Sequence, residues 1–285
     1  MYRLISEIQR TGDENMAQTI DVKSFYEGLD RMYGRHDYGE TEKYLLGSLK
    51  TAQEEMNISL IIAVSNELGG FYRAAGKVDE AKLLNDSVLE ALESIGQDRN
   101  ENYATALMNA ANSHNSAREY DVALSMYKKA EGLLEQLGLG RDYRMAALCN
   151  NISSLYRENG DLEEAEKMAR KSILIISEIP DARLDMATSL INLGEVQTRL
   201  GKYREAEESL RTAAAIYEHD AGGLDIHYAS AVAAMGALEY YKGNLEAAAE
   251  RYRKALELIQ RDFGKSAYYT MIENNLKMVE SEMRK

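Results

Sequence analysis

Side chains that could bind a metal ion are few in this chain of 285 residues. A zinc peptidase carries two histidines four residues apart on one helix face, and a structural zinc site carries closely spaced cysteines. The chain has a single cysteine, Cys149. Its histidines stand in neither arrangement: His36, His114, His219 and His227. We interpret His219, Asp220 and His227 as solvated residues of one connection between predicted helices. We therefore expect neither a metal site nor a cofactor.

The spacing of glycines and carboxylates gives no support to nucleotide binding or acid–base catalysis. The segment from Gly70 to Gly76 and Lys77 is superficially similar to a phosphate-binding loop, but five residues separate its glycines instead of four, and Val78 replaces the required hydroxyl. Paired glutamates recur on predicted outer helix faces, where neighbouring cations and solvent keep them ordinary. The pairs are Glu54-Glu55, Glu163-Glu164 and Glu207-Glu208. We expect the protein not to be an enzyme.

Asparagines recur at a regular spacing. Successive differences of 42, 41 and 83 residues separate Asn109, Asn151, Asn192 and Asn275. The same spacing places Glu67 and Ala234 in the two remaining copies. Asparagine is a mediocre helix former because its amide competes for nearby backbone groups. Since an amide both donates and accepts hydrogen bonds, we expect a specific partner for each one.

A repeat of about 42 residues must position these asparagines. Differences of 42, 42, 41 and 42 separate Ala81, Ala123, Ala165, Ala206 and Ala248. Twelve positions before each alanine stands another small residue: Gly69, Ala111, Ser153, Gly194 and Gly236. A period in this range is typical of a solenoid, and two matching columns of small residues predict that paired helices pack closely in every copy.

Each copy is predicted to consist of a helix, a tight turn and a second helix. Glycine ends a helix at low cost because it adopts the left-handed conformation readily. Four of five copies have a glycine five residues before the repeat alanine. The residues at this position are Gly76, Arg118, Gly160, Gly201 and Gly243. First helices are predicted near 59–75, 102–117, 143–159, 184–200 and 227–242, and second helices near 78–95, 120–137, 162–178, 203–219 and 245–262. The single continuous array comprises an uncertain segment (1–20), a degenerate hairpin (21–57), five repeats (58–264) and a capping helix (265–285).

These columns resemble the tetratricopeptide repeat family, and the spacing with Asn-Asn-Ile or Ile-Asn-Leu in the first helix is similar to the longer repeat of the kinesin light chain group. The resemblance covers about residues 58–283. It implies an all-α, right-handed superhelical solenoid of about six hairpins with a C-terminal capping helix. It also implies that first helices line the concave surface and that asparagines matching Asn109, Asn151 and Asn192 bind the main chain of an extended peptide.

Other polar residues of the first helices are candidates for the same surface. The predicted peptide-binding set is Asn66, Asn109, Asn112, Asn115, Asn150, Asn151, Asn192, Arg73, Arg157 and Asn275. Arg73 and Arg157 share one repeat position, where a guanidinium could receive a carboxylate from a peptide. Two structural alternatives stay open: the asparagines link one repeat to the next, and the arginines form salt bridges with neighbouring glutamates.

Composition restricts the partners and the compartment. The formal net charge is −13 and no basic stripe appears, so a nucleic-acid backbone would be repelled. No apolar run approaches the length that spans a bilayer, and the amino terminus lacks the apolar core of a signal peptide. The single cysteine cannot form an internal disulfide. We expect a cytoplasmic protein without a nucleic-acid or membrane partner.

The sequence thus predicts a non-enzymatic scaffold that binds an extended peptide or protein segment in its concave groove through a ladder of asparagines. One alternative is a regulatory or docking module of a larger enzyme or signalling protein that continues past Lys285. Another is a sensor of the peptide-pheromone type, in which a short peptide closes the superhelix, although no helix-turn-helix domain precedes the repeats.

Overall fold

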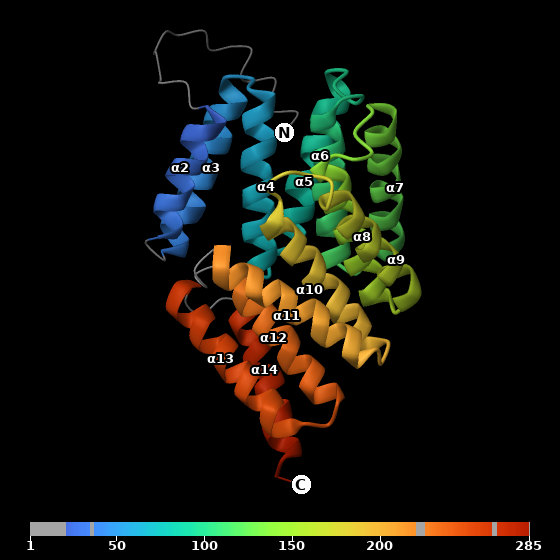
Figure 1. Cartoon of the computed structure of the whole chain (residues 1–285). Helices are drawn as coiled ribbons and strands as arrows, with labels where there is room; N and C mark the ends of the chain where they lie inside the picture. Colours follow the sequence, from blue (N-terminus) through green and yellow to red (C-terminus); the bar gives the residue numbers. More distant parts are fainter. Residues whose placement is uncertain (1–20, 35–36, 221–225, 264–266, 285) are drawn as a thin grey trace. The chain divides into compact units, whose positions relative to one another are not determined.

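Helices account for nearly all of the computed structural model over the residues that it describes, which are 21–34, 37–220, 226–263 and 267–284. In chain order (Figure 1) they are α2 (Val22–Tyr33), α3 (Tyr38–Glu54), α4 (Ile58–Ala74), α5 (Val78–Ser94), α6 (Glu101–Ser116), α7 (Tyr120–Gln136), α8 (Tyr143–Asn159), α9 (Leu162–Ile176), α10 (Arg183–Arg199), α11 (Tyr203–Asp220), α12 (Ile226–Tyr241), α13 (Leu245–Phe263) and α14 (Ala267–Glu282). The predicted all-α array of six hairpins and a final helix is confirmed for the described residues. The uncertain segment at 1–20 lies outside them.

The helices belong to two compact units that meet within α7, between Leu133 and Leu134. We call α2, α4, α6, α8, α10 and α12 the first helices, and α3, α5, α7, α9, α11 and α13 the second helices. In the first unit α2 contacts α4 and α4 contacts α6; in the second unit α8 contacts α10 and α10 contacts α12. Among the described residues no two second helices of one unit are as closely packed. First helices therefore form the inner layer of each unit.

The predicted columns of small residues lie at the centre of the hairpins. All five repeat alanines are fully buried, as are Ala111 and Ser153 in the facing column. The Ser153 hydroxyl donates to the Ala165 carbonyl over 2.8 Å. At Gly194 a Cβ atom would lie 2.6 Å from Cγ of Leu210. Paired helices approach this closely because both columns lack bulky side chains. This close approach explains why small residues recur at both positions of the repeat.

The turns inside the hairpins use the left-handed backbone conformation that was predicted for them. The φ angles are +75° at Gly76, +95° at Gly160, +74° at Gly201 and +83° at Gly243. Arg118 occupies the same position with φ of +62°. A residue with a Cβ atom is strained in this region. The backbone at Arg118 is therefore strained, and the flanking helices α6 and α7 hold it in this conformation.

Ion pairs at one repeated position connect successive hairpins. They join the residue that follows one repeat alanine, or Thr41 in the degenerate hairpin, to the residue four positions before the next alanine. Three pairs follow this rule: Lys77–Glu42 at 2.7 Å, Lys82–Glu119, and Lys202–Glu166 at 2.6 Å. The charges are reversed in Lys82–Glu119, yet the pairing is kept. Links between repeats therefore run along the start of the second helices.

Candidate functional site

The ladder asparagines, which are Asn109, Asn151, Asn192 and Asn275, lie on three first helices and on α14, and their amides have no partner among the described residues. Asn109 on α6 is only 7 % exposed, and Asn151 on α8, Asn192 on α10 and Asn275 on α14 are partly buried. Across the described part of the chain, none of the four side chains makes a hydrogen bond. Their side-chain nitrogen and oxygen atoms are not among the described polar atoms that are buried without a partner, so solvent reaches these amides. The four residues are thus poorly explained by the contacts of the folded chain.

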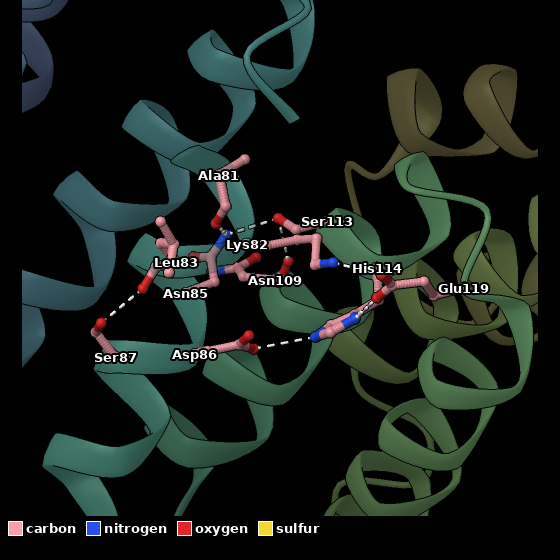
Figure 2. Close-up of polar contacts among 10 residues, drawn as sticks. All are labelled: Ala81, Lys82, Leu83, Asn85, Asp86, Ser87, Asn109, Ser113, His114 and Glu119. Carbon is pink, nitrogen blue, oxygen red and sulfur yellow. Dashed lines mark hydrogen bonds and ion pairs between the residues drawn. The ribbon is translucent and has the colours of Figure 1, made fainter. Parts of the chain in front are cut away.

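Other polar side chains form the links between repeats that were the structural alternative for the ladder. Figure 2 shows the Asn85 amide between the Ala81 carbonyl at 3.1 Å and the Ser113 hydroxyl at 2.9 Å, which joins α5 to α6. In the second unit the Asn150 amide donates to Ser189 over 2.9 Å and joins α8 to α10. Asn85 and Asn150 therefore link the repeats, whereas the ladder asparagines make no such hydrogen bond among the described residues.

The remaining predicted asparagines have different environments. Asn66 donates to Glu67 over 3.3 Å, and Asn112 accepts a hydrogen bond from the Tyr127 hydroxyl at 2.5 Å. Asn115 is partly buried near the end of α6. Asn150 uses its amino group for Ser189, while its Oδ1 atom is buried without a partner. Asn66, Asn112 and Asn150 are thus tied to the protein, whereas the ladder residues make no side-chain hydrogen bond within the described part of the chain.

Arg73, on α4, is a partly buried cation. It makes no ion pair with any described residue, and burial lowers the pKa of its guanidinium. Glu67, which occupies the ladder position on the same helix, has its pKa raised by burial, while hydrogen bonds from Asn66 and Tyr26 oppose that shift. The salt bridge that was one interpretation of Arg73 is absent among the described residues, so its charge remains open to an external anion.

Arg157 differs from Arg73, because it forms an ion pair that joins two first helices. Its guanidinium contacts the Glu195 carboxylate on α10 and donates to the Ser154 hydroxyl over 3.2 Å. Burial lowers the pKa of Arg157. Arg199 on α10 reaches back to donate to the Arg157 carbonyl. The salt-bridge alternative therefore describes Arg157 correctly, with Glu195 as the partner.

A pocket of about 180 Å³ opens beside this ion pair in the second unit. It is lined by Arg157, Glu195, Thr198, Arg199, Ala234, Ala237 and Tyr241, which come from α8, α10 and α12. Ala234 stands at the ladder position of its copy. The lining thus shows that this position faces open space between first helices. Sequence reasoning missed Glu195, Arg199 and Tyr241, since only the packing of three helices brings them together.

A second polar cluster that the sequence did not indicate surrounds His114. Figure 2 shows the imidazole between two carboxylates, with Nε2 at 3.1 Å from Asp86 Oδ1 and Nδ1 in contact with Glu119, which also binds Lys82. Hydrogen bonds from Lys82 and then His114 lower the pKa of Glu119. His114 is 8 % exposed, so the cluster joins α5, α6 and the start of α7. The His114 cluster therefore connects two repeats.

The described residues contain no grouping of histidine, cysteine and acidic side chains that could hold a metal ion. None of their helices has the length and apolar character needed to cross a membrane. The candidate site is therefore defined by amides, guanidinium groups and one small pocket on the first helices.

Solved structures with a similar fold include two that were determined as complexes. The crystal structure of BtubC (BKLC) from P. vanneervenii is 22 % identical over 78 % of this chain and 89 % of its own, with a TM-score of 0.57. NprR in complex with its cognate peptide NprX is 15 % identical over 98 % of this chain and 77 % of its own, with a TM-score of 0.65. A Rap protein complexed with Competence and Sporulation Factor is 14 % identical over 99 % and 80 %, with a TM-score of 0.64.

No curated protein sequence matches this chain. The model of the tetratricopeptide repeat family matches residues 60–136 and 143–219, which together are more than half of the chain. These ranges contain four of the five repeat alanines and the ladder asparagines of α6, α8 and α10. The resemblance seen in the sequence is confirmed, and the chain belongs to the tetratricopeptide repeat family.

Proposed function

We propose that this protein is a non-enzymatic scaffold that binds an extended peptide or protein segment on its first helices, through the ladder asparagines. The observation that carries the proposal is the uncommitted state of those amides within the described structure. Asn109 is the strongest case, since the residue is only 7 % exposed and its side-chain amide, which solvent still reaches, makes no hydrogen bond with any described residue. Alanine would form a better helix at each position.

The chemistry of an amide suits the main chain of a ligand. One amide can donate to a peptide carbonyl and accept from a peptide N–H, whatever side chain the ligand carries. Two further observations support this use. The ladder position at Ala234 faces the pocket of the second unit. NprR and the Rap protein, which share the fold, were crystallised with the peptide NprX and with Competence and Sporulation Factor, respectively.

The expected affinity is modest when the ladder acts alone. A hydrogen bond of this kind contributes about 0.5–1.5 kcal/mol net, so three ladder amides supply roughly 1.5–4.5 kcal/mol. Micromolar binding needs about 8 kcal/mol. A ligand must therefore also fill pockets with its side chains. The ladder would fix where the ligand main chain runs, and the pockets would select its side chains.

A selection from a displayed library of short random peptides tests the proposal. The wild-type protein should enrich peptides, whereas the triple variant Asn109→Ala, Asn151→Ala, Asn192→Ala should enrich none and should melt at the same temperature or slightly above it. Asn85→Ala is the converse control, because its amide links α5 to α6: it should melt lower and still select peptides. A triple variant that melts lower yet selects the same peptides would refute the ladder.

A further inference from the structure

The pocket of the second unit holds more positive than negative charge. Arg157 and Arg199 supply two guanidinium groups, and Glu195 supplies one carboxylate. The ion pair of Arg157 with Glu195 neutralises one cation. Arg199 donates to the Arg157 carbonyl, which is uncharged, and forms no ion pair with any residue in the described ranges. One positive charge is thus left at the pocket, although the whole chain carries a net charge of −13.

The Thr198 hydroxyl of the pocket has no proton to donate to an anion. Thr198 donates its proton to the Gly194 carbonyl over 2.8 Å within α10, so its oxygen offers only lone pairs to the pocket. A ligand group that accepts hydrogen bonds can therefore take them from the guanidinium groups and from the Tyr241 hydroxyl, and only the guanidinium groups carry positive charge. Arg199 is exposed, whereas the Arg157 side chain is 19 % exposed and Glu195 fixes its orientation.

The side of the pocket that α12 forms carries two alanines, and the side chain at its ladder position is short. Ala234 and Ala237 on α12 present single methyl groups, and Tyr241 lies half-exposed at one side. Ala234 replaces the asparagine that the neighbouring helix carries as Asn192. A side chain longer than alanine would take up part of the space beside Arg199. The repeat that lacks a ladder amide therefore offers room for a ligand side chain instead.

We propose that this pocket binds the carboxylate of an aspartate or glutamate in the bound peptide, with Arg199 as its main partner and Arg157, oriented by Glu195, as the second. The inference rests on the proposed function, because it assigns the side-chain preference of a ligand that the ladder holds. A guanidinium presents a planar pair of donors that matches the two oxygens of a carboxylate. The methyl groups of Ala234 and Ala237 would pack against the aliphatic part of the same side chain.

The same peptide selection separates this inference from the ladder. Peptides enriched by the wild-type protein should carry aspartate or glutamate at one position, and Arg199→Ala should lose that preference while still enriching peptides. Arg211→Ala is the matched control, since Arg211 lies on the second helix α11, is 72 % exposed and faces Glu207 at 3.7 Å. This control should keep the acidic preference.

Affinities of one enriched peptide and its version with glutamine in place of glutamate give the quantitative test. The wild-type protein should bind the glutamine version about tenfold more weakly, whereas Arg199→Ala should bind both equally. Equal affinities for the wild-type protein would overturn the carboxylate assignment. If selection still depends on Asn192 but shows no acidic preference, the pocket inference fails alone. If the wild-type protein enriches no peptide, the proposed function fails with it.

Discussion

Replacing Gly194 by alanine tests the close packing of α10 on α11. The new Cβ atom would lie 2.6 Å from Cγ and 2.7 Å from Cδ2 of Leu210, a fully buried side chain. Carbon atoms prefer about 3.5–4.0 Å, so Leu210 must move by about 1 Å. Overpacking of this kind costs roughly 1–3 kcal/mol, while the better helix propensity of alanine returns about 1 kcal/mol. We expect a net destabilisation of about 1 kcal/mol.

Two controls separate the clash from the propensity. Gly47 lies exposed in α3 with nothing within 4 Å of its virtual Cβ, so Gly47→Ala should stabilise by about 1 kcal/mol. In the background Leu210→Ala, which itself costs about 2–5 kcal/mol, Gly194→Ala should also become stabilising by about 1 kcal/mol.

Urea unfolding followed by far-ultraviolet circular dichroism measures the four variants of this cycle and the Gly47 control. The cycle should give a coupling of about 2 kcal/mol between Gly194 and Leu210. The reasoning is refuted if Gly194→Ala raises the unfolding midpoint as Gly47→Ala does, or if the coupling is zero.

Three further predictions concern the hairpins. Ala165→Leu should cost roughly 1–3 kcal/mol in unfolding free energy because Ala165 is fully buried, whereas Glu163→Leu on the exposed face should be nearly neutral; equal urea midpoints would contradict the assigned face. Arg118→Gly should raise the thermal midpoint by relieving about 1 kcal/mol of strain at φ of +62°, and an unchanged midpoint would argue against it. Burial raises the pKa of Tyr252 to about 12, so stability should be constant below about pH 10 and fall by up to roughly 1.4 kcal/mol for each pH unit from there to pH 12; Tyr252→Phe should remove that part of the alkaline loss.

The repeat itself could be read from the chain without coordinates. Hairpins need small residues where their helices touch, so Ala81, Ala123 and their counterparts had to recur at a fixed interval, and the left-handed turn selected glycine in four of five copies. These constraints are local, and local constraints leave a pattern in one chain. The interval also located the ladder asparagines, because any position of a repeat is found once its period is known.

The partners of side chains across helices were decided by tertiary structure. Arg73 and Arg157 occupy the same repeat position, yet of the two only Arg157 forms an ion pair with a described residue. Its partner Glu195 stands on the next first helix, whereas Glu67 acts on Arg73 through its charge without an ion-pair contact. Adjacent asparagines on α8 likewise differ, since Asn150 faces Ser189 and Asn151 faces no described partner.

The sequence by itself thus determined the helices, their pairing and the family, because helix periodicity and turn geometry act over a few residues. Only the tertiary structure decided which amides are already satisfied, where Arg199, Glu195 and Ala234 form one pocket, and that ion pairs such as Lys202–Glu166 connect the repeats. These features depend on contacts between helices whose residues lie about 35–39 positions apart in the chain, which helix packing sets and residue spacing alone does not encode.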